Sequence, residues 1–282
     1  MSLLGKEIRM KRLIDEYNAC IICALDHGMT SPDFLDPLAN MRNLVRDAVR
    51  GGANVFMLGR NYARICISEF KKDTSLALML TATSARHPEK NLTCEIGSVE
   101  EALRFGADAV VVYVALATGQ DKSTIEFTAK VGAECEALGI PFIAEAEYPN
   151  IYMPKGEQKK FGADYLLYNA RICAELGADI IKTNWPGSQE EFAKIVKAVS
   201  PIPVVIAGGH KVSDRELLER MEQGINVGAV GCSVGRNIFL HENPFVITRA
   251  LSRVIREKWT AKKALEELQE ELKNQAERPK RI

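Results

Sequence analysis

Residues 109–114 read Ala-Val-Val-Val-Tyr-Val, an apolar run in which no polar residue alternates with the apolar ones. A strand with one face in water alternates apolar and polar side chains, so this run indicates a strand that is covered on both faces. Parallel strands of α/β proteins are covered in this way, because helices pack on the sheet that they form. We therefore expect a buried parallel strand over residues 109–116.

Similar segments recur along the chain, separated by stretches of helical character. The expected strands are 20–25, 54–58, 76–80, 109–116, 141–147, 179–183, 203–207 and 228–232. Alternation of eight strands with helices predicts a (β/α)8 TIM barrel, an α/β fold in a single domain. A doubly wound open sheet is the alternative, and it favours a Gly-x-Gly-x-x-Gly turn after the first strand. Residues 25–30 read Leu-Asp-His-Gly-Met-Thr and do not match that turn.

Capping signals mark where several helices begin and end. A Ser followed three residues later by Glu is typical of a helix start, because both side chains satisfy free N–H groups there. Such pairs are Ser98–Glu101, Ser123–Glu126, Ser188–Glu191 and Ser213–Glu216. Glycines that can adopt the left-handed turn at a helix end are Gly106, Gly139, Gly177 and Gly224. A strand is expected soon after each of these glycines.

Charge and apolar spacing divide the chain into a barrel and an extension. Residues 1–250 are expected to form the barrel, with residues 1–18 as a short helix over its bottom. Residues 251–282 are expected to form a charged helical extension, in which Leu265, Leu268 and Leu272 follow one stripe. A segment of this kind is typically solvated or in contact with another subunit.

The charge balance favours a small ligand as the main partner. The chain has 37 Lys and Arg against 37 Asp and Glu, a formal net charge of +0. Nucleic acids and acidic membranes bind proteins with a surplus of basic residues, so neither is an expected partner. No signal peptide is visible at the amino terminus, and no apolar run approaches the roughly 20 residues that span a bilayer. We expect a protein of the cytoplasm.

The cysteines and histidines indicate no metal site. The chain has 7 cysteines, in apolar or helical contexts, and they are expected to be reduced core residues. Cys20 and Cys23 have the Cys-x-x-Cys spacing, but on a strand this spacing puts the two thiols on opposite faces. The histidines lie far apart in sequence, and none forms a local ligand pair. No metal and no other cofactor is expected.

Lys182 is the most informative candidate for chemistry. The active sites of TIM barrels lie at the carboxyl ends of the strands, and Lys182 ends the apolar run Asp-Ile-Ile-Lys at 179–182. A buried lysine amine whose pKa is lowered from about 10.4 to about 7–8 is a Schiff-base nucleophile. An apolar barrel mouth is expected to lower the pKa in this way. The alternative is a structural lysine paired with Asp26 or a glutamate.

Acidic side chains follow two other strands. Asp26 has the parity of Ile22 and Ala24, and is a candidate for accepting a proton or orienting a substrate hydroxyl, while His27 points the other way and is expected to support it. Glu145 and Glu147 share one face of their strand, whereas Tyr148 belongs to the other face unless the strand kinks. Which of these groups transfers the proton is left open by the spacing alone.

Two glycine pairs predict a phosphate site. Gly208 and Gly209 follow the seventh expected strand, and Gly235 and Arg236 follow the eighth. TIM barrels frequently bind phosphate at these two loops with backbone N–H groups and the start of a short helix. A small phosphorylated substrate is therefore expected, with Arg236 adding a charged fork.

Four short motifs resemble those of the DhnA-type class I aldolases. They are Leu-Asp-His-Gly at 25–28, Ile-Lys-Thr at 181–183 followed by Gly187, Val-Ile-Ala-Gly-Gly at 205–209 and Val-Gly-Arg-Asn-Ile-Phe at 234–239. The family is similar to archaeal-type class I fructose-bisphosphate aldolases and to 2-amino-3,7-dideoxy-D-threo-hept-6-ulosonate synthase. The resemblance covers about residues 20–250. It implies a metal-free (β/α)8 barrel, a Schiff base on Lys182, assistance by Asp26, phosphate binding by the glycines with Arg236, and a homo-oligomer, commonly a decamer.

One motif departs from the family pattern. The catalytic tyrosine of the family stands in Tyr-Pro-Arg-Gly, whereas Tyr148-Pro149 is followed here by Asn150. The interval from Pro141 to Tyr148 is one residue too long, and Glu147 takes the position of the tyrosine when no gap is introduced. The acid or base is therefore either Tyr148 or Glu147.

Three functions fit the sequence. The first is a class I aldolase that acts on a phosphorylated ketose and releases dihydroxyacetone phosphate or a similar ketone. The second is a transaldolase-like synthase or an acyl or thiol transferase on the same barrel, which the altered motif favours. The third is a non-catalytic sensor of a phosphorylated ligand.

Overall fold

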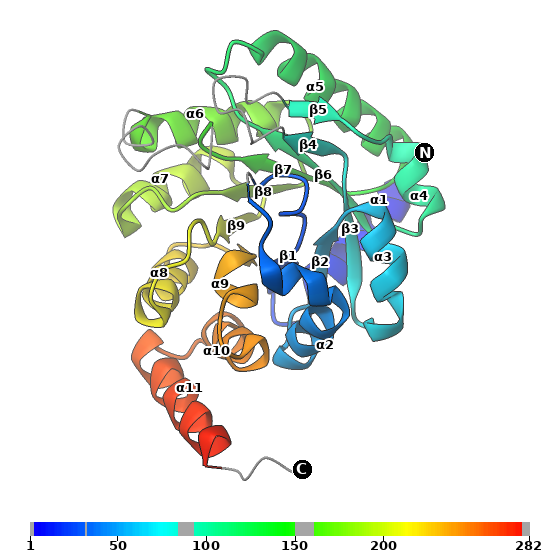
Figure 1. The fold of residues 1–282 in the computed structure, drawn as a ribbon. Coiled ribbons are helices and arrows are strands. Elements are labelled where there is room, and N and C mark those ends of the chain that lie inside the picture. The colour runs from blue at the N-terminus through cyan, green and yellow to red at the C-terminus, as the bar shows by residue number, and fades with distance from the viewer. Residues whose placement is uncertain (1–2, 32, 84–92, 150–160, 278–282) are drawn as a thin grey trace.

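The computed structural model describes residues 3–31, 33–83, 93–149 and 161–277, and within them eight parallel strands close a barrel (Figure 1). The barrel strands are β1 (Cys20–Ala24), β2 (Val55–Leu58), β3 (Ser75–Met79), β6 (Ala109–Val114), β7 (Phe142–Ala146), β8 (Ile180–Thr183), β9 (Val204–Ala207) and β10 (Gly231–Val234). Their order around the barrel is β1-β10-β9-β8-β7-β6-β3-β2. The predicted TIM barrel is confirmed.

Most of the helices surround the strands as a ring (Figure 1). The helices are α1 (Leu3–Leu13), α2 (Met41–Gly51), α3 (Arg60–Cys66), α4 (Val99–Arg104), α5 (Asp121–Leu138), α6 (Gly162–Glu175), α7 (Gln189–Val199), α8 (Asp214–Asn226), α9 (Arg236–Phe239), α10 (Pro244–Arg256) and α11 (Ala261–Ala276), with 3-10 turns η1 (Asp36–Asn40) and η2 (Ile67–Glu69). Helix α11 lies outside this ring, against α8 and α10 (Figure 1). None of the helices in the described ranges is both long and apolar enough to cross a membrane.

Two strands outside the barrel were not predicted. β4 (Thr81–Thr83) and β5 (Thr93–Glu95) form a small antiparallel sheet beyond the end of β3. Each is three residues long and partly exposed, so neither has the apolar run that marks the barrel strands. Cys94 lies in β5 and is exposed, so the expectation that it is a core residue is wrong.

Most of the capping signals are confirmed. Ser98, Ser188 and Ser213 each accept a hydrogen bond at 3.2 Å from the backbone N–H three residues later. The fourth signal is wrong, because α5 begins at Asp121 and Ser123 lies inside its first turn. The Asp121 carboxylate accepts from the N–H groups of residues 117 and 118, and it fixes the chain just before the helix.

The glycine signals are confirmed with one exception. Gly106, Gly139 and Gly177 have positive φ just beyond α4, α5 and α6. Gly224 lies inside α8, where a Cβ would overlap the side chain of Ile206. The turn comes instead at Gly228, whose φ is 104°. This turn explains why β10 spans 231–234 instead of the expected 228–232.

Side chains of the barrel strands alternate between its interior and the layer of helices. Cys20 packs in the interior with Ile22 and Ala24, whereas Cys23 packs in the outer core under the helices. The two thiols therefore lie on opposite faces of β1, as the spacing predicts. The same alternation puts Ile180 inside and Ile181 outside on β8, so Lys182 points into the barrel.

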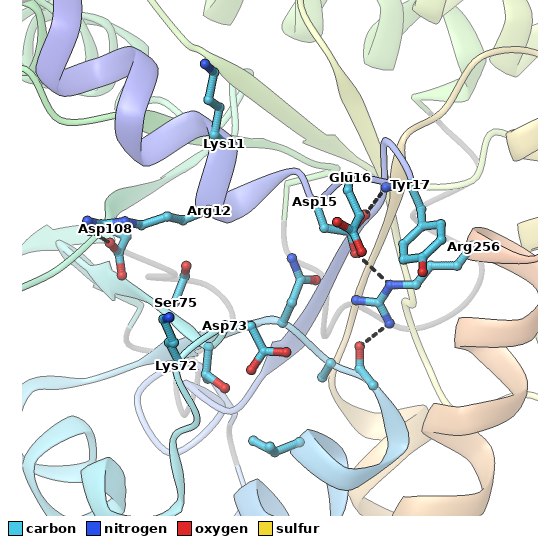
Figure 2. A pocket seen from close by; sticks show the side chains of 15 residues that line it. Lys11, Arg12, Asp15, Glu16, Tyr17, Lys72, Asp73, Ser75, Asp108 and Arg256 are labelled. Carbon is cyan, nitrogen blue, oxygen red and sulfur yellow. Dashed lines mark hydrogen bonds and ion pairs between the residues drawn. The ribbon is translucent and has the colours of Figure 1, made fainter.

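A partly buried ion pair joins the beginning and the end of the barrel. Nε of Arg256, the last residue of α10, donates to Oδ2 of Asp15 at 2.6 Å, and Nη1 donates to the carbonyl of Gly52 at 2.6 Å. Figure 2 shows the Arg256 side chain directed at Asp15, on one wall of a cleft of about 830 Å³. We call this contact the Asp15–Arg256 clamp. Helix α11 follows and packs on α8 and α10, and the expected boundary at residue 250 falls within α10.

Candidate active site

Lys182 lies at the carboxyl end of β8 and contacts two carboxylates from β7. Glu145 is its register neighbour in the sheet, and the Lys182 amine donates a hydrogen bond to Glu145 Oε1. The amine also forms an ion pair with Glu147 Oε1 at 3.0 Å. All three side chains are buried, with Lys182 only 7% exposed. The structure thus brings together three of the predicted site residues.

Glu147 reaches Lys182 because the backbone curves immediately after β7. Its N–H donates to the carbonyl of Glu145 at 3.0 Å, and its own carbonyl accepts from Asn169 Nδ2 at 3.2 Å. This local bend keeps Glu145 and Glu147 on the same side of the chain, so that both carboxylates face one amine. The predicted common face of the two glutamates leads directly to this arrangement.

The charge on Lys182 differs from the expectation. Burial lowers the pKa of the amine, but the negative charges of Glu145, Glu147 and Asp26 outweigh it and raise the pKa above its ordinary value. The expected lowering is therefore wrong for the site without substrate, because the barrel mouth is acidic and not apolar. Lys182 thus has both features that the sequence analysis treated as alternatives. It lies at the mouth of the barrel, and it is paired with carboxylates.

The pKa values of two carboxyl groups of the site are raised as well. Burial and the nearby negative charges of Glu147 and Asp26 raise the pKa of Glu145, Lys182 lowers it, and the net result is a pKa of about 8. Burial also raises the pKa of Asp26, against the charges of Lys182 and Arg236. A carboxyl group with a raised pKa is thus placed against the lysine amine. Such a group can give and take protons during a reaction at that amine.

Tyr148 is not brought to Lys182. Its hydroxyl donates to the carbonyl of Gly162 at 3.1 Å, and its ring stacks on Tyr165 with centroids 5.9 Å apart. Burial raises the pKa of its hydroxyl. Glu147 therefore occupies the place beside the lysine, in accord with the alignment in which no gap is introduced.

His27 lies beside Asp26 and packs against a neighbouring aromatic ring. Its Nδ1 is 3.7 Å from Asp26 Oδ1, and its ring meets Phe239 edge-on at 5.1 Å. Burial, together with the positive charges of Arg236 and Lys182, lowers the pKa of His27 to about 3. The imidazole is therefore neutral at physiological pH.

The two glycine pairs have different roles. The Gly208 N–H donates to the carbonyl of Ser233 at 3.0 Å, so it continues the sheet and is not available to a ligand. Gly209 has a φ of 65° and open space where a Cβ would lie. A Cβ on Gly235 would overlap the ring of His27, so this glycine is required by packing. Gly209 therefore has room for a ligand beside its Cα, whereas the missing Cβ of Gly235 makes room for His27.

Arg236 is held against the loop that follows β9. Its side chain is 7% exposed, and Nη1 lies 3.1 Å from Nδ1 of His210. Asn237 ties the same loop to α9, because its Nδ2 donates to the carbonyls of Gly208 and His210 at 3.0 Å each. Its Oδ1 accepts from the Val212 N–H at 2.9 Å. Arg236, Gly209 and His210 are thereby fixed as one unit.

Comparison with known proteins now places the chain in a family. The family model for the DeoC/LacD aldolases matches residues 20–241. The chain belongs to the DeoC/LacD family of aldolases. This aldolase is 31% identical over 255 residues to a 2-amino-3,7-dideoxy-D-threo-hept-6-ulosonate synthase of Halobacterium salinarum, an alignment that covers 90% of this chain and 93% of the relative. It is 32% identical over 254 residues to such a synthase of Archaeoglobus fulgidus, with 90% and 92% covered.

A solved structure supports the same assignment. An archaeal fructose-1,6-bisphosphate aldolase, with its catalytic lysine covalently bound to the carbinolamine intermediate of the substrate, superposes with a TM-score of 0.78. It is 25% identical to this aldolase, and the match covers 89% of this chain and 99% of that one. The resemblance to class I aldolases is confirmed at the level of the family and of the barrel.

Several polar residues of this aldolase were not predicted as part of the site. Tyr113 points into the barrel from β6 and donates its hydroxyl to the carbonyl of Tyr148 at 2.9 Å. Asn184 accepts from the Tyr148 N–H at 2.8 Å, and Asn237 is fully buried. A polar side chain within an otherwise apolar strand end is the signal that could have found them. Among the residues that the structure describes, no group of three or more His, Cys, Asp and Glu could hold a metal ion.

Proposed function

We propose that this aldolase breaks, and in the reverse direction forms, a carbon–carbon bond of a phosphorylated ketose through a Schiff base on Lys182. The observation that carries the proposal is the Lys182 amine held between Glu145 and Glu147 at the carboxyl end of the barrel. The family and the archaeal relative with its lysine-bound carbinolamine support it.

Activation of the lysine begins with a proton transfer. Lys182 is charged in the site without substrate, and an amine must be neutral to attack a carbonyl carbon. One of the two contacting carboxylates takes a proton from the amine, which replaces a buried ion pair by two neutral groups. Such an exchange is less costly inside a protein than in water, because burial disfavours both charged forms.

The carbon chemistry then follows from the same carboxyl groups. The neutral amine adds to the keto carbon and forms a carbinolamine, and a protonated glutamate gives its proton to the departing hydroxyl as water leaves. The resulting iminium withdraws electrons from the adjacent bond. Glu147 or Asp26 accepts the proton of the hydroxyl at the breaking bond, the aldehyde leaves, and reprotonation with hydrolysis frees the ketone. We favour Glu147 as the base because it contacts the lysine.

The phosphate of the substrate is expected next to the lysine at the ends of β9 and β10. Arg236 supplies a permanent positive charge, and Gly209 leaves room for a close approach to its backbone. The ketone product is then dihydroxyacetone phosphate or a similar phosphorylated ketone. A homo-oligomer and a cytoplasmic location are retained as expectations.

Borohydride trapping tests the proposal. Incubation with ketose phosphates and borohydride is expected to give an adduct mass on the peptide that carries Lys182, and Lys182→Met is expected to lose both adduct and turnover. Trapping reduces the iminium, so it reports the covalent step directly. An unmodified peptide with every ketose phosphate and ketone phosphate tested contradicts the proposal.

A second candidate is a synthase that transfers the enamine to an acceptor instead of releasing it. The displaced Tyr148 and the two synthases among the relatives favour it. Product analysis with one donor and a panel of acceptors separates the two, because without an acceptor a synthase releases at most one equivalent of aldehyde per active site and no free ketone. The third function, a sensor without catalysis, is excluded if the unmodified protein shows turnover and Lys182→Met does not.

A further inference from the structure

Ser233 carries a buried hydroxyl group that has no role in the mechanism so far. The residue is 2% exposed and belongs to β10, where Cys232 and Val234 on either side of it pack in the outer core. Because side chains alternate along a strand, Ser233 points into the barrel. Its Oγ forms no hydrogen bond with any residue in the described part of the chain.

The register of the strands puts Ser233 in the same interior layer as Lys182. Strands of a TIM barrel are tilted, so a layer of four side chains comes from alternate strands and advances by one residue from each register partner to the next. Lys182 pairs with Val205 on β9. The next residue, Ile206, pairs with Cys232 on β10, and Ser233 follows. Continued around the barrel, these steps return to Lys182 and give a layer of Met57, Val111, Lys182 and Ser233.

Lys182 has a hydrogen-bond donor to spare in this layer. An ammonium group has three N–H donors. One donates to Glu145, and Glu147 Oε1 lies 3.0 Å from the same nitrogen. No third acceptor contacts the amine among the residues that the structure describes. Buried polar groups normally have partners, so the amine and the Ser233 hydroxyl share one layer with bonding capacity left in both.

The surroundings limit what can join these two groups. The imidazole of His27 lies where a Cβ of Gly235 would be, one step nearer the barrel mouth than Ser233, so it covers the hydroxyl from that side. Strand β9 lies between β8 and β10, and the residue that it turns inward just above this layer is Ala207, which has only a methyl group. The position therefore suits a water molecule, which bonds to two or more polar groups, and not the carbon chain of a sugar.

We infer that the Ser233 hydroxyl holds a water molecule beside the Lys182 amine, and that Schiff-base formation releases this water and hydrolysis consumes it. The inference rests on the proposed aldolase function and deepens it. In the iminium the keto carbon is bonded to Nζ, so a water on Ser233 lies next to that carbon. The positioning role of Ser233 is to hold this water at the carbon that it attacks.

Hydrolysis then proceeds with a defined path for each proton and electron pair. The water oxygen forms a bond to the keto carbon, the π electrons of the C=N bond return to nitrogen, and one of the contacting glutamates takes a proton from the water. The product is the neutral carbinolamine. In the reverse direction the carbinolamine hydroxyl takes that proton, its bond to carbon breaks, and it leaves as the water that Ser233 holds.

Exchange of the keto oxygen reports this water directly. Dihydroxyacetone phosphate is incubated with the protein in water labelled with the heavy oxygen isotope. Each round of Schiff-base formation and hydrolysis then replaces the keto oxygen, which mass spectrometry measures. Lys182→Met gives the uncatalysed background.

Ser233→Ala is expected to lower the maximal exchange rate about tenfold, the loss of roughly one hydrogen bond in the transition state. The ketone concentration that gives half of the maximal rate should stay the same, because formation and hydrolysis are slowed equally. Ser75→Ala makes the same change at a buried position at the start of β3, at the other end of the barrel, and serves as the control. Denaturant unfolding of each variant verifies that the fold is kept.

The outcomes separate this inference from the function on which it rests. A fall in the maximal rate confined to Ser233→Ala supports the inference. An unchanged rate overturns it, and so does an equal fall in Ser75→Ala. A higher ketone requirement at an unchanged maximal rate also overturns it, because the hydroxyl would then bind the ketone itself. An unmodified protein that gives neither exchange nor a borohydride adduct overturns the aldolase function, and the inference with it.

Discussion

His27 shows how one buried side chain links the site to stability. Its imidazole is wedged between Asp26 and Phe239, and Gly235 leaves the space for it. Protonation would add a buried positive charge close to Arg236 and Lys182, and this is why its pKa is lowered to about 3. The ring therefore supports the first loop as a neutral group.

The depressed pKa predicts a pH dependence of stability. As the pH falls below about 6.5, His27 takes up a proton in the unfolded chain but not in the folded one until near pH 3. The free energy of unfolding should therefore decrease on acidification, with up to about 1.4 kcal/mol per pH unit coming from this residue. Urea unfolding of His27→Gln at pH 7, 6 and 5 should show a shallower decline than the unmodified protein. Parallel curves would contradict the prediction.

The reactive side chains could be predicted from the sequence, but the effects of their charges on one another's pKa values could not. Lys182, Glu145, Glu147 and Asp26 could be named one by one, because each stands at the end of an apolar run. Their contact depends on the register of β7 against β8, which pairs Glu145 with Lys182. Register between strands that are far apart in sequence is set by barrel closure, so the direction of the lysine pKa could not be predicted.

Among the elements, the short helix α9 holds the loop after β9 in position. Asn237 bonds to Gly208, His210 and Val212 of that loop, and these contacts fix the position of His210 against Arg236. A helix of one turn has little stability of its own. The three hydrogen bonds are therefore the main restraint on the geometry of the proposed phosphate site.

Replacing this amide should affect phosphate recognition selectively. Asn237→Asp keeps the acceptor for the Val212 N–H and loses the two donated bonds, so KM for dihydroxyacetone phosphate is expected to rise about tenfold or more. KM for unphosphorylated dihydroxyacetone should change little, since its keto carbon meets Lys182. Steady-state kinetics with both ketones measures the difference. Equal increases for both ketones would assign a purely structural role to Asn237.

Sequence signals predicted the ends of helices well where the stabilising contact lies within a few residues of the signal. Ser98, Ser188 and Ser213 cap helices through bonds that span three residues, and these starts are confirmed. Gly224 does not end a helix but makes room for packing, because a Cβ there would overlap the side chain of Ile206 in β9. The β4–β5 sheet could not be predicted, since its pairing of Thr81 with Glu95 crosses residues that carry no strand pattern.

For the molecule as a whole, the Asp15–Arg256 clamp is expected to contribute more to the free energy of unfolding than surface ion pairs do. Arg256 is 16% exposed, and it also donates to the Ser252 hydroxyl at 2.8 Å. Arg256→Ala removes three hydrogen bonds and leaves Asp15 without its cation, so we expect a loss of about 2–4 kcal/mol in the free energy of unfolding. Arg256→Lys should restore only part of it, because an ammonium lacks the planar fork.

Denaturant unfolding checks the clamp against a matched surface pair. Arg104 and Glu100 form an exposed ion pair on α4, and Arg104→Ala should leave the stability nearly unchanged. Equal effects of Arg104→Ala and Arg256→Ala would show that the clamp is no more than a surface contact.

Closure of the barrel between β1 and β10 also sets the order of events during synthesis. Cys20 pairs with Gly231, so one edge of the first strand has no neighbour until the ribosome has made the last strand. At about 5–20 residues per second, that interval lasts on the order of tens of seconds. Throughout it, the nascent chain carries an open hydrogen-bonding edge, the kind of surface through which unfinished chains associate. Synthesis of β10, residues 231–234, is therefore the step that lets the barrel cover this edge.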